Sequence, residues 1–420
     1  MNKNYRKLGV ILLILSLLMM PLFTYLFIIS LHSTRLISDS LSSVVLALAI
    51  FSVFLFIYSL ITIFTSPREK KMKLIPKILL IVFFTGYIGI SSSVMVLLYG
   101  PYTGFKDWLV TTAMTTLSHK YFAEWFYDDF AIEEVMENNE VVEAGDDSNP
   151  DLVVISSANT SEQTIYANEY EEAVLKRDEG NTLYKIIDIK EKRYKGKLAV
   201  IYDPSKVHIG ISKYMGSNVD TAKGQYIYDI EKNYNAVLSM NASGFYDPGY
   251  NSHGGVPRGA VFSFGSLKIN NSGYKFSTGG MIGFDQNNKM ILSKTMTVEQ
   301  AKAKGIRDGI QYGPFLIVNG KSSFVKGNGG WGTAPRSAIA QRKDGIVLFL
   351  VIDGRQAASV GADMNDLVTI LKRYGAYNAA NLDGGTSSAM SVNGKIITNP
   401  RNGSYKAKTR WVPDAWIVTK

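Results

Sequence analysis

The sequence contains no cysteine and only four histidines among its 420 residues. Without cysteine no disulfide can form, so any domain of this chain must be stable through its hydrophobic core alone. No histidines are spaced as zinc ligands usually are, which argues against a zinc enzyme. Basic residues are absent from one long stretch, because residues 121–175 hold 15 acidic side chains and no Lys or Arg.

Hydrophobic residues make up 46% of the chain, and they are concentrated near the N-terminus. Apolar runs extend over Leu8–Leu31, Leu41–Phe64 and Leu74–Tyr99. Each run reaches the roughly 20 residues that a helix needs to cross a bilayer. We therefore predict three transmembrane helices, which form a membrane anchor over residues 1–99. A cleaved signal peptide is the alternative for the first run, but no small-x-small cleavage pattern follows it.

The distribution of basic residues orients these spans, because Lys and Arg resist translocation across the membrane. Seven basic residues lie before the first span or between the second and the third: Lys3, Arg6, Lys7, Arg68, Lys70, Lys71 and Lys73. The loop between the first two spans carries only Arg35. The N-terminus is therefore predicted to be cytoplasmic and the chain after Tyr99 to be extracellular. An external domain without cysteine resembles the surface proteins of Gram-positive cells.

Residues 100–181 are predicted to form a linker with two parts. Aromatic and leucine side chains recur at near-helical spacing between Phe105 and Phe126. This pattern indicates either an amphipathic helix at the outer membrane face or a stalk helix that packs on the third span. From Asp128 to Asp151 the chain is acidic, and this part either stays solvated or docks against a basic domain.

Residues 176–420 carry the opposite charge, with 34 basic and 18 acidic side chains and a net charge of +16. A cationic field of this kind raises the local concentration of anionic partners. Outside a cell we expect the partner to be a phosphate-containing glycan or wall polymer, such as a teichoic acid or an exopolysaccharide, rather than nucleic acid.

Residues 182–420 are predicted to form an α+β domain, with a mixed β-sheet and flanking helices. Strands are expected at 184–189, 198–202, 207–211, 236–240, 315–318, 346–352 and 390–392. Asn-Gly at 319–320 and at 393–394 predicts two tight hairpins. A helix is expected around 226–234. Capping residues Thr297 and Asp363 predict two further helices, which end at Gly305 and Gly375.

Four polar, glycine-rich segments follow strands of this domain. They are Asn241–Asp247 with its continuation His253–Gly259, Gly332–Ala338, Val351–Arg355 and Asn381–Met390. Any one of them is explained by an ordinary turn, in which Gly adopts positive φ and Asp or Asn caps the backbone. Together they bring three arginines and several carboxylates into one domain, which is the composition that a site for an anionic ligand needs.

In this order, the segments Asn-Ala-Ser-Gly-Phe-Tyr, Pro-Arg-Ser-Ala-Ile-Ala, Val-Ile-Asp-Gly-Arg and Asn-Leu-Asp-Gly-Gly-Thr-Ser-Ser resemble the phosphodiester glycosidase family. The resemblance covers roughly residues 184–420 and none of the predicted membrane part. It implies hydrolysis of the bond between a sugar's anomeric carbon and a phosphodiester, as in an N-acetylglucosamine-1-phosphodiester. A phosphate is a weakly basic leaving group, so its departure needs little protonation.

Residue roles follow from this implied reaction. Arginine forks bind phosphate oxygens, and the candidates are Arg258, Arg336 and Arg355. A glycosidase also needs one carboxylate as nucleophile or base and normally a second as acid. We predict Asp383 and Asp353 as this pair, with Asp247 in reserve and His253 as a further proton donor. Other substrate contacts are predicted at Asn241, Asn381, Gly384, Gly385, Thr386 and Ser387, although either asparagine is equally well explained as a structural cap.

No cofactor is firmly predicted. Ca²⁺ or Mg²⁺ held by Asp383, Asp353 or Asp247 is an open alternative, because hard cations prefer carboxylate oxygens. Thr386 stands where members of the family usually carry a third glycine. Because a β-branched side chain disfavours positive φ, Thr386 is expected to limit how closely a ligand approaches the backbone there.

Two functions are compatible with the sequence. The first is a membrane-anchored extracellular hydrolase, a phosphodiester glycosidase that acts on surface glycans or teichoic-acid-like polymers. The second is a non-catalytic module that binds or assembles anionic wall polymers through the same basic surface.

Overall fold

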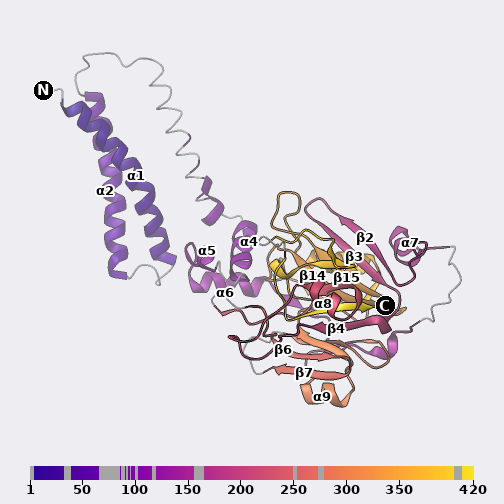
Figure 1. Ribbon diagram of the computed structural model, residues 1–420. Helices are drawn as coiled ribbons and strands as arrows, with labels where there is room; N and C mark the ends of the chain where they lie inside the picture. Colours follow the sequence, from indigo (N-terminus) through magenta and orange to yellow (C-terminus); the bar gives the residue numbers. More distant parts are fainter. Residues whose placement is uncertain are drawn as a thin grey trace. The chain divides into compact units, whose positions relative to one another are not determined.

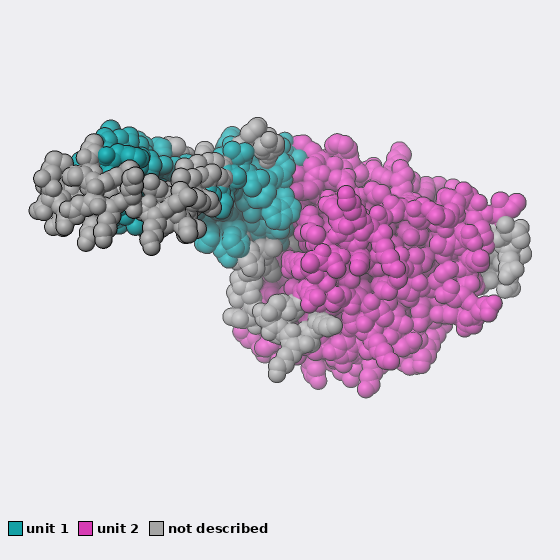
Figure 2. Space-filling model, turned by 90° about the horizontal axis from the view of Figure 1, so that it is seen from above, with its two compact units in different colours: residues 1–138 teal, residues 139–420 magenta. Residues whose placement is uncertain are grey.

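The computed structural model describes residues 4–32, 39–65, 86, 90, 93–94, 96–99, 103–115, 120–155, 165–248, 253–272, 279–401 and 409–420. The chain divides into two compact units, residues 1–138 and 139–420. Figure 1 labels their elements, and Figure 2 shows the two units in different colours. All of the described strands belong to the second unit.

Two long helices begin the first unit, α1 (Asn4–His32) and α2 (Asp39–Thr65). Each contains a stretch that is long and apolar enough to cross a membrane, Leu8–Ile28 in α1 and Val45–Phe64 in α2. These stretches coincide with the first two predicted spans. The third predicted span, residues 74–99, lies mostly outside the described residues, so two candidate spans are described rather than three.

Three shorter helices follow in the first unit: α4 (Thr103–Met114), α5 (Tyr121–Glu124) and α6 (Asp129–Asn138). The single helix expected between Phe105 and Phe126 is therefore wrong, because α4 ends at Met114 and α5 begins only at Tyr121. Six buried side chains hold the three helices together: Val110, Ala113, Ala123, Tyr127, Ile132 and Val135. The interruption lets both α4 and α6 bury an apolar face within this small cluster.

In its described residues, the second unit contains three large sheets and one small one. The seven-stranded sheet has the order β12 (Lys321–Ser322), β11 (Phe315–Val318), β16 (Ala376–Asn381), β14 (Arg336–Arg342), β15 (Val347–Ile352), β3 (Lys195–Ile201) and β2 (Tyr184–Lys190). One five-stranded sheet has the order β7 (Ser266–Asn271), β6 (Gly259–Ser263), β10 (Asp308–Tyr312), β8 (Gly280–Phe284) and β9 (Met290–Ser293). The other has the order β18 (Lys395–Ile396), β17 (Met390–Val392), β5 (Ala236–Asn241), β19 (Asp414–Thr419) and β4 (Val207–Ile211). The small sheet pairs β1 (Val141–Val142) with β13 (Phe324–Val325).

All strand pairings in the described ranges are antiparallel. The sequence predicts strands and helices in the right places, but it predicts one mixed sheet where the structure has several antiparallel ones. Helices and strands do combine in one domain, as expected.

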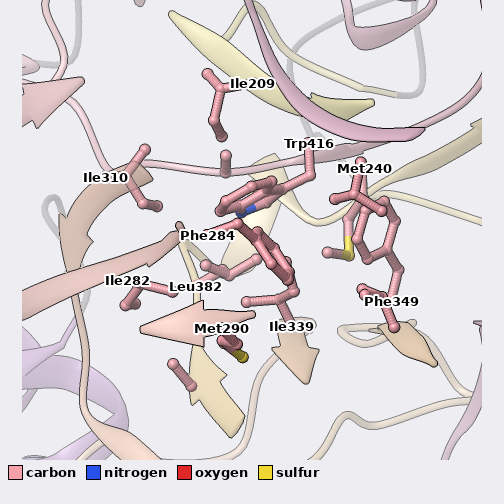
Figure 3. Close-up of a cluster of buried hydrophobic side chains, with 14 of the residues drawn as sticks. Ile209, Met240, Ile282, Phe284, Met290, Ile310, Ile339, Phe349, Leu382 and Trp416 are labelled. Carbon is pink, nitrogen blue, oxygen red and sulfur yellow. The ribbon is translucent and has the colours of Figure 1, made fainter. Parts of the chain in front are cut away.

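The main hydrophobic core lies where the three large sheets meet (Figure 3). Trp416 of β19 is fully buried and packs edge-to-face on Phe284 of β8, with ring centroids 5.6 Å apart. Phe349 of β15 joins the same cluster from the seven-stranded sheet. Burial of such side chains stabilises the fold by roughly 1.5–3 kcal/mol each. Leu382 also belongs to this core, so the residue before Asp383 is fixed by packing.

Four helices of the described second unit pack on the sheets. They are α7 (Glu169–Leu175) and α10 (Met364–Arg373) on the seven-stranded sheet, α8 (Ile227–Asn233) on the sheet of β5 and β19, and α9 (Val298–Ala303) on the sheet of β6 and β8. Figure 1 labels three of them, α7, α8 and α9. Because both faces of the seven-stranded sheet are covered, every residue of β15 is buried. The continuous apolar run at 346–352 is thereby explained.

Local signals in the sequence are confirmed at several turns. Asn319 and Asn393 have φ of 52° and 49°, and the glycine after each also has positive φ, as two-residue hairpins require. Thr297 and Asp363 each form a capping box, in which the side chain accepts a hydrogen bond from the backbone three residues later. These contacts are local, so the sequence alone was sufficient to predict them.

The acidic segment before the domain contributes to the second unit, which begins at residue 139 rather than at 182. The Glu143 carboxylate accepts a hydrogen bond from the Phe315 amide at 2.6 Å and lies 2.8 Å from Lys294 Nζ. Ser148 donates its amide to the Leu292 carbonyl at 2.8 Å. Residues 139–148 therefore dock on the basic domain, which was one of the two alternatives for the acidic part of the linker.

Candidate active site

The predicted motifs meet at one edge of the seven-stranded sheet. β15 and β16 both end at this edge, at Ile352 and Asn381, and β14 begins between them at Arg336. Two strand spacings separate β15 from β16, which is roughly 10 Å. The sheet thus places the segments after β15 and β16 on either side of the Arg336 side chain.

The turn after β16, residues 382–388, is held by backbone contacts to two of the other motifs. The Leu382 amide donates to the Ser337 carbonyl at 2.9 Å, and the Gly385 amide donates to the Pro335 carbonyl at 2.8 Å. The Asp383 amide donates to the Ala242 carbonyl at 3.3 Å. The backbone of Asp383 is therefore fixed by the ends of β5 and β14 together.

Asn241 links three segments through its side chain and is fully buried. Its Nδ2 donates to the Asp383 carbonyl at 2.7 Å, while its Oδ1 accepts from Ser337 Oγ at 2.7 Å and from the Ala389 amide at 3.2 Å. Asn381 is also buried, and its Nδ2 donates to the Gly313 carbonyl at 3.0 Å. Both asparagines are bound within the protein framework, as the structural alternative for them expects.

The Asp383 carboxylate lies beside Tyr312 of β10, whose hydroxyl donates to Oδ1 at 3.4 Å. Burial raises the pKa of the Asp383 carboxyl above its usual value near 3.8, while a hydrogen bond from Ser387 and the positive charges of Arg410 and Arg258 oppose this effect. Burial and the charge of Asp383 raise the pKa of Tyr312, so its hydroxyl keeps its proton and remains a donor. Sequence reasoning missed Tyr312, which lies in no motif.

Gly244 makes room for Tyr312. A Cβ atom on Gly244 would lie 2.7 Å from Cε2 of the Tyr312 ring, which is too close for any side chain. Gly244 is therefore needed because it leaves space for the Tyr312 ring, 68 residues later in the chain, rather than because it forms a turn.

Arg336 and Arg355 flank the two glycines after Asp383. A Cβ atom on Gly384 would lie 3.4 Å from Arg336 Nη1, and one on Gly385 would lie 3.3 Å from Arg355 Nη2. Within the described part of the chain, neither arginine forms an ion pair with a carboxylate. Two guanidinium groups without a direct ion-pair partner in the described residues therefore approach the same short stretch of backbone.

Arg336 is 4% exposed and is held in place by the carbonyls of Trp331, Gly332 and Ala362, the last at 3.3 Å. Burial lowers its pKa to about 10, so the guanidinium is still charged at neutral pH. Burial also lowers the pKa of Arg355, which has a backbone φ of 57°. Arg258, the third predicted arginine, lies close enough to Asp383 and Tyr312 to affect the pKa of both.

Thr386 and Asp247 meet at an arginine that the sequence did not single out. Arg410 Nη2 donates to Asp247 Oδ2 at 2.8 Å, and Arg410 Nη1 lies 3.4 Å from Thr386 Oγ1. Asp247 is thus engaged in an ion pair. The positive φ of the turn falls on Gly385, at 63°, and Thr386 is not among the residues with positive φ. Thr386 therefore does not have the positive φ on which the expected restriction depends, and the effect of its side chain on a ligand stays a prediction.

Asp353 and His253 make no contact with Asp383 in the part of the chain that the structure describes. The Asp353 Oδ1 accepts a hydrogen bond from the Asn399 amide at 2.7 Å, and burial raises the pKa of this carboxyl. His253 is exposed, with its ring 5.9 Å from that of Trp411. These two predicted catalytic residues therefore lie outside the group of side chains that contact Asp383.

Another carboxylate, which is fully buried, lies near Asp383 and was also missed. Asp414, at the start of β19, accepts hydrogen bonds from the Ser243 amide at 2.8 Å and from Ser243 Oγ at 2.7 Å. Its negative charge has no ion-pair partner within the described residues. Burial raises the pKa of Asp414 to about 6, and the charge of Asp383 adds to the effect.

No group of three or more His, Cys, Asp or Glu residues is arranged to hold a metal ion in the described ranges. Asp247 pairs with Arg410, and Asp353 binds the Asn399 amide. These two carboxylates and Asp383 therefore bind different partners and do not share one. A Ca²⁺ or Mg²⁺ site stays a prediction.

Comparison with known proteins shows which family the residues of this site resemble. The family model described as phosphodiester glycosidase matches residues 234–419, a range that contains Tyr312, Asp383, Arg410 and Asp414. A prophage-derived uncharacterized protein of Bacillus subtilis, YomE, is 27% identical over 210 residues, which are 49% of this chain and 31% of that protein. This chain thus spans about a third of that relative's length.

Solved structures resemble the chain more distantly. The catalytic domain of zebrafish N-acetylglucosamine-1-phosphodiester alpha-N-acetylglucosaminidase is 18% identical, with a TM-score of 0.46 over 56% of this chain and 82% of that one. A hypothetical protein from Synechocystis is 16% identical, with a TM-score of 0.39 over 56% and 62% of the two chains. The four sequence motifs all lie within residues 234–419, the range that the phosphodiester glycosidase family model matches.

Proposed function

We propose that the second unit is a hydrolase that cleaves the bond between a sugar's anomeric carbon and a phosphodiester. The family match supports this class of reaction. The observation that carries the proposal is the approach of Arg336 and Arg355 to Gly384 and Gly385, directly after the Asp383 carboxylate. One turn then carries a carboxylate for the sugar, and two cations for the phosphate lie beside it.

The phosphate is proposed to bind between the two guanidinium groups. Gly384 and Gly385 carry no Cβ, so a ligand can approach the backbone beside Arg336 and Arg355. Charge-assisted hydrogen bonds from arginine to phosphate oxygens are roughly twice as strong as neutral ones. Partial burial of the site strengthens them further, because the local dielectric constant is lower than that of water.

In the proposed reaction, a water oxygen forms a bond to the anomeric carbon while the bond from that carbon to the phosphate oxygen breaks. The electron pair of the broken bond stays on the phosphate, where the two arginines stabilise the charge. Asp383 takes one proton from the attacking water and returns it to the phosphate monoester or to solvent. Because phosphate leaves without an acid, this single displacement needs only one carboxylate.

Tyr312 and Ser387 are proposed to orient the Asp383 carboxylate toward the water. Both hydrogen bonds reach this carboxylate from within the protein, from a strand of another sheet and from the turn itself. A base whose orientation is fixed before substrate binds loses less entropy on the way to the transition state.

The finer features of the function are proposed from the rest of the chain. The apolar helices α1 and α2, together with the third apolar run at residues 74–99, are proposed to anchor the protein in a membrane as three spans, with the N-terminus cytoplasmic and the second unit outside the cell. The net charge of +16 over residues 176–420 supports an anionic substrate. We propose a surface glycan or teichoic-acid-like polymer that carries a sugar-1-phosphodiester, such as one of N-acetylglucosamine.

The proposal is tested with the full chain in detergent micelles, incubated with UDP-N-acetylglucosamine or with an N-acetylglucosamine-1-phosphodiester. Release of free sugar is the expected result, and an Asp383→Asn protein is the control. Sugar release no greater than that of the control would contradict the proposal. Salt-sensitive binding of wall polymer without turnover, unchanged in the control, would instead support the binding-module alternative.

Arg355→Gln is expected to weaken inhibition by inorganic phosphate by about 10- to 100-fold, because it removes a charge-assisted contact. The fold should persist, since the Arg355 side chain makes no hydrogen bond in the described ranges. Phosphate inhibition constants for the parent and the variant measure the effect. Lys304→Gln, which removes an equal charge from the exposed end of α9, should leave the constant within about twofold; equal weakening in both proteins would refute a specific contact.

A further inference from the structure

Arg410 is fixed in the site by three contacts from two segments, Asn241–Asp247 and Asn381–Met390. Its guanidinium pairs with Asp247 at 2.8 Å, lies 4.4 Å from the centroid of the Phe245 ring, and reaches Thr386 Oγ1 at 3.4 Å. The Asp247 side chain is only 3% exposed, whereas that of Arg410 is 24% exposed. The pair therefore presents the arginine rather than the carboxylate to a ligand.

Arg410 differs from Arg336 and Arg355 in its charge balance. The ion pair with Asp247 compensates its charge, whereas no carboxylate pairs with the other two arginines in the described residues. An anionic phosphate gains most from the cations whose hydrogen-bonding groups are not already taken up by a carboxylate. A neutral group with oxygen atoms gains directional hydrogen bonds from a compensated arginine without needing a net charge. The compensated side of the turn therefore suits the neutral part of the substrate, which is the sugar.

Thr386 supplies a second polar atom on this side. Its Oγ1 both donates and accepts hydrogen bonds, and Arg410 Nη1 donates them. Two such atoms 3.4 Å apart match two adjacent oxygens on a pyranose ring. A glycine at position 386, which other members of the family usually have, would provide no side-chain contact of this kind.

We propose that Arg410 and Thr386, held by Asp247 and Phe245, form a sugar-binding subsite that recognises two adjacent oxygen substituents of a pyranose. The inference rests on the proposed function, because it places the sugar of the sugar-1-phosphodiester on this side of the Asp383 turn. It assigns Arg336 and Arg355 to the phosphate, and Arg410 with Thr386 to sugar specificity.

The test compares two inhibitors of sugar release by the full chain in detergent micelles, N-acetylglucosamine and inorganic phosphate. Thr386→Val keeps the shape of the side chain and removes the hydroxyl, so it should weaken inhibition by N-acetylglucosamine about 3- to 10-fold. Arg410→Lys keeps the charge and removes the fork, so it should weaken the same inhibition about 10-fold or more. Phosphate inhibition should change by less than about twofold in both variants.

Thr386→Ser keeps the hydroxyl and should restore sugar inhibition to within about twofold of the parent, which separates hydrogen bonding from side-chain packing. Unchanged sugar inhibition in Thr386→Val, or equal weakening of both inhibitors in both variants, would overturn the subsite. Melting temperatures of all three variants report whether they fold.

The subsite can be tested even without turnover. Saturation-transfer NMR with N-acetylglucosamine measures sugar binding by the parent, Thr386→Val and Thr386→Ser proteins directly. Binding that depends on the Thr386 hydroxyl in a protein without hydrolytic activity would refute the proposed function and support the subsite. If the protein releases sugar, but its binding of N-acetylglucosamine does not depend on the Thr386 hydroxyl, the proposed function is supported and the subsite is refuted.

Discussion

Asp383→Asn is expected to lower kcat/KM for sugar release by about 10²- to 10⁴-fold, the range in which general acid–base catalysis contributes. The amide keeps the size of the side chain and can still accept the hydrogen bond from Tyr312, but it cannot take a proton from water. Because Asp383 is anchored through its backbone to Ala242 and Asn241, the turn should keep its conformation in the variant. Steady-state kinetics with an N-acetylglucosamine-1-phosphodiester measure the loss.

Asp353→Asn is the matched control for this prediction. The Asp353 carboxylate binds the Asn399 amide, and an asparagine Oδ1 can accept the same hydrogen bond. We therefore expect this variant to keep kcat/KM within about tenfold of the parent. A loss as large as that of Asp383→Asn would instead show that the two carboxylates act together in the reaction, as the sequence predicts.

The pH profile gives an independent measure of Asp383. Burial raises the pKa of its carboxyl above the usual 3.8. Since the ionised form is the base, activity should be full above the raised pKa and fall as the pH drops through it. The acidic limb of kcat/KM should therefore lie at a higher pH than the one at which an exposed Asp titrates. A limb at or below the pH at which an exposed Asp titrates would contradict Asp383 as the base.

The sequence predicts much of the fold because many of its signals are local. The apolar run of β15, the capping boxes at Thr297 and Asp363, and the Asn-Gly turns each depend on residues close together in the chain. The motifs also predicted Asp383 and Arg336 as site residues of one domain, and the structure brings the segments that carry them to one sheet edge. The arrangement into several antiparallel sheets depends on long-range pairing, which no local pattern encodes.

The residues that the sequence missed share one physical reason. Tyr312, Arg410 and Asp414 come from β10, from the segment before β19 and from β19 itself, and they meet Asp383 only after three sheets have assembled. None lies in a glycine-rich motif. Asp414 did carry one signal, because an acidic residue that opens an otherwise apolar strand, Asp-Ala-Trp-Ile-Val, is unusual for a buried position.

Asp414 has a measurable effect on stability. It is completely buried, and its hydrogen bonds within the described residues come only from Ser243, so its ionised form is poorly stabilised. Its folded-state pKa of about 6 lies above the usual 3.8. Between these two values the unfolded chain has lost its proton while the folded protein still holds it. Stability should therefore fall as the pH rises from about 4 to about 6 and then stay level.

Asp414→Asn is expected to stabilise the second unit at pH 7 by up to about 3 kcal/mol, because a shift of about two pKa units corresponds to this free energy. The asparagine resembles the protonated carboxyl in shape, and its Oδ1 can accept both hydrogen bonds from Ser243. At pH 4 the variant and the parent should be equally stable, since Asp414 is then protonated in the folded protein. Urea unfolding in detergent, followed by near-ultraviolet circular dichroism at both pH values, measures the difference. A variant that is less stable than the parent at pH 7 would show that the protein stabilises the charged form of Asp414, and would place a cationic partner or an ion beside it.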